Sequence, residues 1–187
     1  MVTDPRQRLI ASATALLADE GVEAVTLRRI AREAGVSHGA PLRHFTGRSD
    51  LLSAVATAGF AELRRQSEEV PAVTPHERLL GTCRSYMDFA LGNPAMFELM
   101  FRHDLIDADS PELSGTNSAL LDHFSRLIGD AQAAGWRTGA DPRVLAASLW
   151  AALHGLAELW LRGGLGKALR SDEVDAALDV TLQTYLG

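Results

Sequence analysis

The sequence predicts an all-α protein of about nine helices. Apolar residues recur at intervals of three and four, which is the spacing of a helix with one buried face. Segments open at Asp-Pro, Asn-Pro or Thr-Pro pairs and close at glycines, and these are start and stop signals of helices. Apolar and polar residues do not alternate cleanly, so we expect no strands. We expect a three-helix domain in residues 1–50 and a second helical domain in residues 51–187.

The first two helices have clear boundaries in the sequence. Asp4 precedes Pro5 and should cap a helix that ends at Gly21. Thr26 should cap a short second helix that ends at Gly35, because glycine suits a left-handed turn. The residues spaced for burial are Leu9, Ala13, Leu16 and Leu17 in the first helix and Leu27, Ile30, Ala31 and Ala34 in the second.

The next two helices are expected on either side of a break at Thr46-Gly47. Ser37 should cap a third helix that runs to about Phe45. A fourth helix should begin near Arg48 and bury its own apolar stripe, which consists of Leu51, Leu52, Val55, Ala58 and Leu63.

The second half of the chain is expected to follow a linker at residues 70–73. Thr74 and Glu77 have the spacing of a capping box, with which a fifth helix should begin and run to about Leu91. Later helices are expected from Asn93-Pro94, over 116–134, from Asp141-Pro142 to Gly163, and from a cap at Ser171.

Composition narrows the class of protein. The chain has 187 residues, of which 47% are apolar and 22% charged, as in soluble globular proteins. Cys83 is its one cysteine, which excludes an intrachain disulfide and the Cys-rich zinc sites. No apolar run reaches about 18 residues and the start lacks a signal-peptide core, so we expect a cytoplasmic protein without membrane spans.

Charge is distributed unevenly along the chain. Seven Arg and six acidic residues leave residues 1–50 with a net charge of +1, whereas residues 51–187 carry −7. The basic residues are 17 Arg and the single Lys167, and the planar guanidinium suits phosphates and guanine edges. A polyanion is therefore not repelled by the first part of the chain, although a GC-rich genome would explain the arginine excess equally well.

Two short helices joined by residues 34–37 have the spacing of a helix-turn-helix, whose second helix enters the major groove of DNA. The same run resembles the DNA-binding domain of the tetracycline-repressor (TetR) family of bacterial regulators. The matching residues are Ile30-Ala31, Ala34-Gly35-Val36-Ser37, Leu42-Arg43-His44-Phe45 and Arg48. The later residues Trp150, His154 and Gly155 are similar to a Trp-x-x-x-His-Gly signature of one subgroup.

Two residues bear on how the expected third helix meets DNA. The family usually has a phosphate-contacting Tyr where this chain has Leu42, so the resemblance implies that one backbone contact is missing. Pro41 lacks an amide proton, which makes the start of this helix irregular.

The resemblance implies a set of DNA-binding residues. Helix N-termini should face phosphates, and Arg28 should reach a guanine edge. Arg43 should reach a base edge or a phosphate, and His44 with Arg48 should clamp phosphate. Without the resemblance, Arg28, Arg29 and Arg32 would be taken for a solvated helix face. The expected DNA-binding residues are Thr26, Arg28, Ser37, His38, Gly39, Ala40, Pro41, Arg43, His44 and Arg48.

Two further sites are expected in the second domain. The family encloses an apolar or aromatic effector between helices, although such residues also form ordinary cores. It dimerises through its last two helices, and here these are apolar on more than one face, which indicates burial on both sides. The expected pocket residues are Tyr86, Phe97, Met100, Phe101, Phe124 and Trp150. The expected dimer residues are Leu149, Leu153, Gly155, Leu156 and Leu182.

Catalytic and metal sites are not expected, nor is a cofactor. The cluster of His103, Asp104, Asp107 and Asp109 lies in a predicted turn, and solvated carboxylates explain it. Cys83 is expected to be a buried thiol and His154 a hydrogen-bonded core histidine. No nucleophile elbow, phosphate loop or HExxH motif occurs.

The leading hypothesis is therefore a ligand-responsive repressor that binds an inverted repeat in double-stranded DNA as a homodimer. An activator of the same build remains open. The alternative is a helical small-molecule-binding protein or enzyme with a vestigial helix-turn-helix, which the substitution by Leu42 favours.

Overall fold

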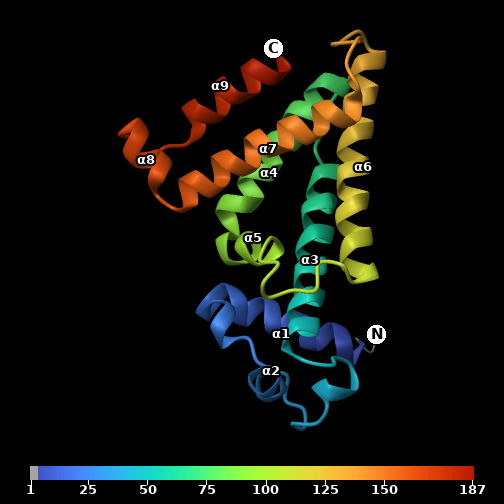
Figure 1. Cartoon of the computed structure of the whole chain (residues 1–187), viewed down its shortest axis with the longest axis vertical. Helices are drawn as coiled ribbons and strands as arrows, with labels where there is room; N and C mark the ends of the chain where they lie inside the picture. The colour runs from blue at the N-terminus through green and yellow to red at the C-terminus, as the bar shows by residue number, and fades with distance from the viewer. Residues whose placement is uncertain (1–3) are drawn as a thin grey trace. The chain divides into compact units, whose positions relative to one another are not determined.

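The computed structural model describes residues 4–187, which contain nine α-helices, two short 3-10 turns and no strand (Figure 1). The all-helical prediction is confirmed. The contacts divide the chain into two compact units. The first takes in the chain up to Glu62 and Asn93–Asn117, and the second consists of Leu63–Gly92 and Ser118–Gly187. A functional domain boundary at residue 50 stays a prediction.

The first unit begins with α1 (Pro5–Glu20), whose boundaries follow the sequence signals. The Asp4 carboxylate accepts a hydrogen bond from the Arg6 amide at 3.2 Å, and Gly21 ends the helix at φ 81°. The turn η1 (Val22–Ala24) comes next. The buried face of α1 consists of Leu9, Ile10, Ala13, Leu16 and Leu17.

The predicted third helix from Ser37 to Phe45 is wrong. In its place lies a single 3-10 turn, η2 (Pro41–Arg43), and no side-chain cap precedes it. Ser37 therefore caps no helix, although its carbonyl accepts the amide of Ala40 at 2.9 Å. Pro41 has no amide proton to donate, so the hydrogen-bond ladder of an α-helix cannot run through this segment.

The core of the first unit is completed by α3 (Arg48–Glu68), which continues into the second unit, and α5 (Pro94–Met100). The ring of Phe101 packs edge-on against Phe60 at 5.6 Å and Phe97 at 5.4 Å between centroids. The Asp107 amide donates to the Ser53 hydroxyl at 2.8 Å, which holds the loop after α5 against α3.

The second unit is built around α4 (Pro75–Gly92), α7 (Pro142–Leu161) and α9 (Asp175–Leu186), which pack against one another (Figure 1). The predicted linker and capping box are confirmed. The Glu77 amide donates to the Thr74 hydroxyl at 3.1 Å, and the Thr74 amide donates to the Glu77 carboxylate at 2.9 Å. These bonds hold the pKa of Glu77 below its usual value.

Two helix starts in the second half differ from the sequence prediction, and one additional helix is present. Helix α6 (Pro111–Ala133) begins five residues before position 116, because Pro111 can occupy the first helical position. The short α8 (Gly164–Leu169) was not expected. Helix α9 begins at Asp175, so the Ser171 hydroxyl caps only a local turn, in which it accepts the Glu173 amide at 3.1 Å.

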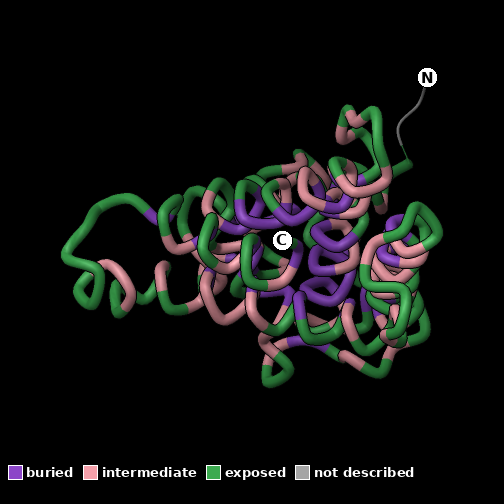
Figure 2. The backbone as a smooth tube through the Cα atoms, turned by 90° about the horizontal axis from the view of Figure 1, so that it is seen from above, coloured by how far each residue is buried: buried purple, intermediate pink, exposed green. Residues whose placement is uncertain are grey.

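Burial alternates along the helices, so that most have one inner and one outer face (Figure 2). The prediction that α7 is buried on both sides depends on a partner chain and stays a prediction. Its buried residues form one stripe, Ala146, Leu149, Leu153 and Ala157, whereas Val144 and Leu159 are exposed. Within residues 4–187, α7 is the one helix whose length and apolar composition would also fit a membrane span.

Candidate nucleic-acid interface

The turn after α2 (Leu27–Glu33) has the geometry that the sequence predicts for a helix-turn-helix. The Thr26 hydroxyl caps the helix by accepting the Arg29 amide at 3.2 Å. At the other end, Gly35 has φ 66° and the Val36 amide donates to the Ala31 carbonyl at 2.9 Å. This is a glycine-terminated helix end that fixes the exit direction of the chain.

The segment that follows turns one apolar residue inward and the next outward. Pro41 is buried, whereas the Leu42 side chain is 63% exposed. The burial of Pro41 favours a packing role in the free chain, and its assignment as a DNA-binding residue stays a prediction. Leu42 is not part of the core. Packing in the core therefore does not explain why this chain has leucine where the family usually has tyrosine.

The arginines of this region fall into two groups. Arg29 pairs with Glu20 at 2.6 Å and Glu33 at 2.8 Å, and Arg32 pairs with Glu33 at 3.3 Å. Arg28 and Arg43 are exposed and form no ion pair within residues 4–187. A guanidinium without an internal partner is available to DNA, so Arg28 and Arg43 remain the best base-reading candidates.

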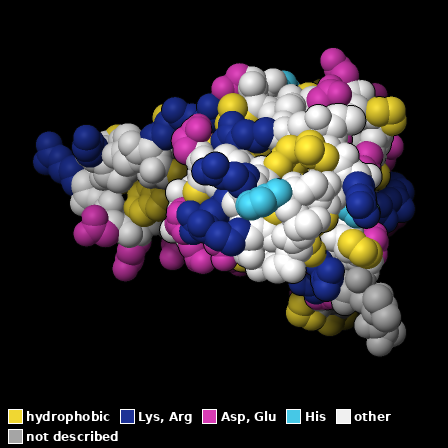
Figure 3. Space-filling model, turned by 90° about the horizontal axis from the view of Figure 1, so that it is seen from below, with side chains coloured by type: hydrophobic (Ala, Val, Ile, Leu, Met, Phe, Trp, Pro, Cys, Tyr) yellow, Lys and Arg dark blue, Asp and Glu magenta, His cyan; other side chains and the backbone are white. Residues whose placement is uncertain are grey.

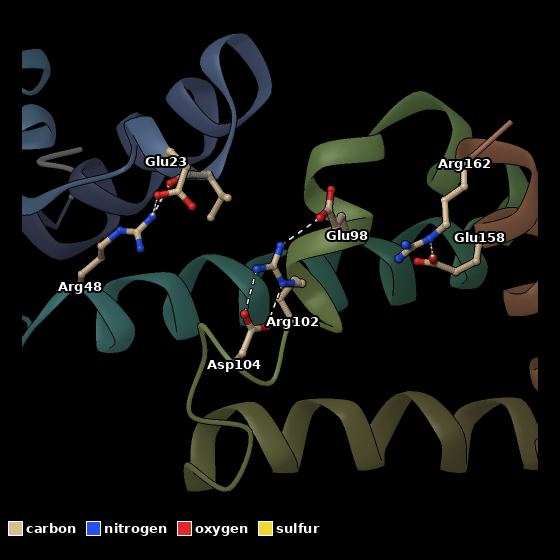
Figure 4. Close-up of polar contacts among 8 residues, drawn as sticks. Glu23, Arg48, Glu98, Arg102, Asp104, Glu158 and Arg162 are labelled. Carbon is tan, nitrogen blue, oxygen red and sulfur yellow. Dashed lines mark hydrogen bonds and ion pairs between the residues drawn. The ribbon is translucent and has the colours of Figure 1, made fainter.

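Arg48 is held by the protein itself. Its Nε donates to the Val25 carbonyl at 2.8 Å, and its Nη2 donates to the Val22 carbonyl at 2.7 Å. Glu23 lies 3.5 Å from the same nitrogen (Figure 4). Arg48 thus ties the start of α3 to η1, and only Nη1 lies outside these bonds. The expected phosphate clamp is therefore at best shared with this structural role.

A shallow depression of about 460 Å³ lies beside α2 and is lined by Ala24, Thr26, Arg28, Arg29, Arg32 and His38. Figure 3 views the molecule from below, the side on which α2 lies in Figure 1, and shows basic side chains gathered around a histidine. Among the other expected contacts, Ser37, His38 and Gly39 are exposed, and Ala40 and His44 are half-buried. The surface is basic, polar and concave, which suits a phosphate backbone.

The residues expected to line an effector pocket belong to both units. In the first unit, Phe97 and Met100 are buried and Phe101 is half-buried. In the second, Tyr86 is buried and Phe124 and Trp150 are partly exposed. Contact with an effector stays a prediction for all six.

Within the second unit, Trp150 and His154 on α7 both meet Tyr86 on α4. The Trp150 indole donates to the Tyr86 hydroxyl at 3.3 Å, and this hydroxyl lies 3.0 Å from Nδ1 of His154. Burial raises the pKa of Tyr86 and lowers that of His154. The predicted hydrogen bond of His154 is confirmed, whereas its side chain is half-buried and does not lie in the core.

The other reactive side chains have structural roles. Cys83 is fully buried, and burial raises the pKa of its thiol to about 12, so the prediction of a buried thiol is confirmed. Asp104 pairs with Arg102 at 2.8 Å, and this contact holds the pKa of Asp104 below its usual value (Figure 4). Within the described residues, no group of His, Cys, Asp and Glu has the arrangement of a metal site.

The sequence did not indicate a buried polar cluster formed by Ser67, Thr82 and His123 in the second unit. The Ser67 hydroxyl donates to Thr82 Oγ1 at 3.2 Å and lies 2.9 Å from His123 Nε2. These residues are far apart in the chain, and each one alone looks like an ordinary polar position on a helix. Only the packing of α3, α4 and α6 brings them together.

An all-helical fold with a basic, concave face beside α2 is typical of a DNA-binding regulator. The family profile "Bacterial regulatory proteins, tetR family" matches residues 9–55, and "Tetracyclin repressor-like, C-terminal domain" matches residues 79–185. The chain belongs to the TetR family of transcriptional regulators. The expected family is confirmed, whereas membership of the Trp-x-x-x-His-Gly subgroup stays a prediction.

Individual proteins are similar to parts of the chain or to nearly all of it. The chain is 44% identical over 52 residues to the HTH-type transcriptional regulator SrpR of Pseudomonas putida, a match that spans 28% of this chain and 24% of SrpR. A protein with unknown function from Rhodococcus sp. RHA1 is 31% identical with a TM-score of 0.84, over 97% of this chain and 93% of that one. A TetR/AcrR-family regulator from Thermobifida fusca shares the fold at 21% identity and a TM-score of 0.72, over 99% and 98% of the two chains.

Proposed function

We propose that this regulator is a repressor that binds an inverted repeat as a homodimer and releases it when an effector binds. The proposal rests on two observations. The surface beside α2 that carries Arg28, His38 and Arg43, here called the reading head, is basic, and α7 exposes an apolar face. A two-fold operator requires two reading heads, and a dimer supplies them.

The proposed dimer surface is the outer face of α7 with the adjoining face of α9. Val144, Ala147, Ala151, Gly155 and Leu159 follow one another at intervals of three or four residues, and all are exposed or half-buried. A Cβ at Gly155 would meet no atom within 4 Å, so a partner helix has room for a close approach. On α9, Val180 is 64% exposed. A single chain leaves this apolar stripe in water, and a second copy would cover it.

This surface revises the expected dimer residues. Leu149, Leu153 and Leu182 are each at most 2% exposed within the chain, so they have no surface left for a partner. Gly155 and Leu156, which are half-buried, remain in the proposal.

The proposed effector is an apolar or aromatic small molecule held by the helices that follow the reading head. Aromatic and methionine side chains supply adaptable apolar walls, as the Phe60–Phe101 and Trp150–Tyr86 contacts illustrate. The effector would act by binding one dimer geometry more tightly than the other. The proposed place of action is the cytoplasm, where the family's DNA targets lie.

The experiment selects bound duplexes from a random DNA library and then measures the affinity for the selected duplex at several salt concentrations. A palindromic winner whose affinity falls steeply with salt supports the dimeric reader, because phosphate contacts release counterions. A chain that enriches no sequence, even after denaturation and refolding to strip a bound effector, has a vestigial reading head. That outcome favours the alternative of a helical small-molecule-binding protein or enzyme.

A further inference from the structure

Leu42 is an exposed apolar side chain on a surface built for a polyanion. Its side chain is 63% exposed, whereas its neighbours Pro41 and Phe45 are buried. The amides of His44 and Phe45 both donate to the Pro41 carbonyl at 2.9 Å. These two bonds fix the backbone of the turn and therefore the direction in which the Leu42 side chain points.

The chemistry around Leu42 limits what it can contact. Arg43 follows it directly, and Arg28 and His38 line the depression of the same reading head. Leucine has no hydrogen-bond donor, so it cannot bind the phosphates that these cations attract. In the major groove, the group that takes an alkyl contact is the C5 methyl of thymine.

We propose that Leu42 recognises a thymine methyl and thereby specifies a T·A pair in each half of the operator. The inference rests on the proposed function, in which this turn enters the major groove. Pro41 is buried, so Leu42 is the exposed apolar side chain of this turn. A leucine at this position then contributes base specificity where a tyrosine would contribute a phosphate bond.

The test removes only the methyl group. In the duplex that the wild type selects from a random library, each thymine is replaced in turn by deoxyuridine, which keeps its pairing and its O4 acceptor. The wild type should lose about fourfold in affinity at one position of the half-site, the value of one apolar methyl contact. Replacement in both half-sites should cost about sixteenfold. The variant Leu42→Ala should bind more weakly and should not respond to deoxyuridine at that position.

A matched control is Val73→Ala, which trims another apolar side chain that is 95% exposed and lies in the second unit. This variant should keep the wild-type response to deoxyuridine. The melting temperature of Leu42→Ala should equal that of the wild type, because an exposed side chain contributes little to stability.

The outcomes separate this inference from the proposed function. Tight, salt-dependent binding of a palindrome that is insensitive to deoxyuridine at every position overturns the role of Leu42 and leaves the reader intact. An equal loss in the wild type and Leu42→Ala also overturns it, because another residue then reads the methyl. If no duplex is selected at all, the proposed sequence-specific function fails, and the inference fails with it.

Discussion

The guanidinium of Arg48 lies 2.7 Å from the carbonyl oxygen of Val22, 26 positions earlier in the chain. Together with the bond to the Val25 carbonyl, this contact joins the start of α3 to the segment that leads into α2. The family resemblance assigns a phosphate to this residue, whereas the structure assigns it two carbonyls. Arg48 therefore positions the reading head, whatever it contributes to DNA.

The first prediction concerns this positioning role. Arg48→Ala removes the side-chain donor from the Val25 carbonyl and one of two donors from the Val22 carbonyl, which also accepts the Val25 amide. The free energy of unfolding should therefore fall by ~1–3 kcal/mol. Urea denaturation followed by circular dichroism measures the change. The matched variant Arg43→Ala, which removes an exposed arginine from the same head, should leave the unfolding curve unchanged. Equal stability of the two variants would show that the carbonyl contacts contribute nothing.

The second prediction concerns the contribution of Arg28 and Arg43 to specific DNA binding. Each is exposed and unpaired within residues 4–187, so Arg28→Ala and Arg43→Ala should each weaken specific binding by ~1–3 kcal/mol. Competition between the selected duplex and a scrambled one measures the effect, since loss of base reading reduces the ratio of the two affinities. Arg143→Ala, an exposed arginine on α7, is the control and should bind like the wild type. Unchanged binding by both head variants would refute the base-reading assignment.

The sequence predicted helix ends correctly where hydrogen bonds between residues close in the chain determine them. Asp4, Gly35 and the pair Thr74 and Glu77 set helix ends through bonds within four residues, so their effect can be read without knowledge of the fold. The third helix failed for an equally local reason, because Pro41 removes the amide that an α-helix through Ser37 to Phe45 needs.

The features that the sequence did not predict are the buried face of α7 and the contact between Ser67 and His123, and both depend on packing. Leu149 and Val144 are both apolar residues of α7, yet one is 1% and the other 62% exposed, because only the contacts with α4 and α9 decide which face is inside. Hydropathy and the family resemblance indicate which helices are apolar, but they do not distinguish the inner face of a helix from its outer face. Ser67 and His123 meet across 56 positions of sequence, and no local pattern marks such a pair.

The third prediction concerns Leu42→Tyr, which adds the hydroxyl donor that the family usually has at this position. Leu42→Tyr should tighten binding to a scrambled duplex by ~0.5–1.5 kcal/mol, because a phosphate hydrogen bond does not depend on sequence. The salt dependence should stay the same, since a neutral hydroxyl displaces no counterion. Fluorescence anisotropy at several salt concentrations measures both quantities. Weaker binding of Leu42→Tyr to the scrambled duplex would show that the side chain faces no phosphate.

The fourth prediction concerns the proposed dimer. Ala151→Glu places a charge in the middle of the exposed stripe on α7 and should give folded monomers, because an unpaired carboxylate resists burial between helices. Analytical ultracentrifugation measures the mass. The contrasting variant Leu153→Ala opens a cavity at a residue that is 1% exposed, so it should destabilise the chain by ~2–5 kcal/mol. A dimer that survives both Ala151→Glu and Val180→Glu would place the interface elsewhere.

The last prediction follows from the buried cluster of Ser67, Thr82 and His123. Burial, together with the charges of Arg126, Arg64 and Arg78, lowers the pKa of His123, and Glu68 opposes the shift. Between this lowered value and the 6.5 of an ordinary histidine, the unfolded chain binds more protons than the folded one. The free energy of unfolding should therefore fall as the pH falls through and below 6.5, and the lost stability should return above it.

The measurement is the thermal midpoint of wild type and His123→Gln at pH values from about 5 to 8, where histidine titrates. The glutamine can still donate to the Ser67 hydroxyl but cannot gain a proton, so its midpoint should depend less on pH. Some dependence should remain, because burial also lowers the pKa of His154. The control His38→Gln changes an exposed histidine and should keep the wild-type slope. If His123→Gln and His38→Gln lose stability in parallel at low pH, the acid sensitivity arises outside the cluster.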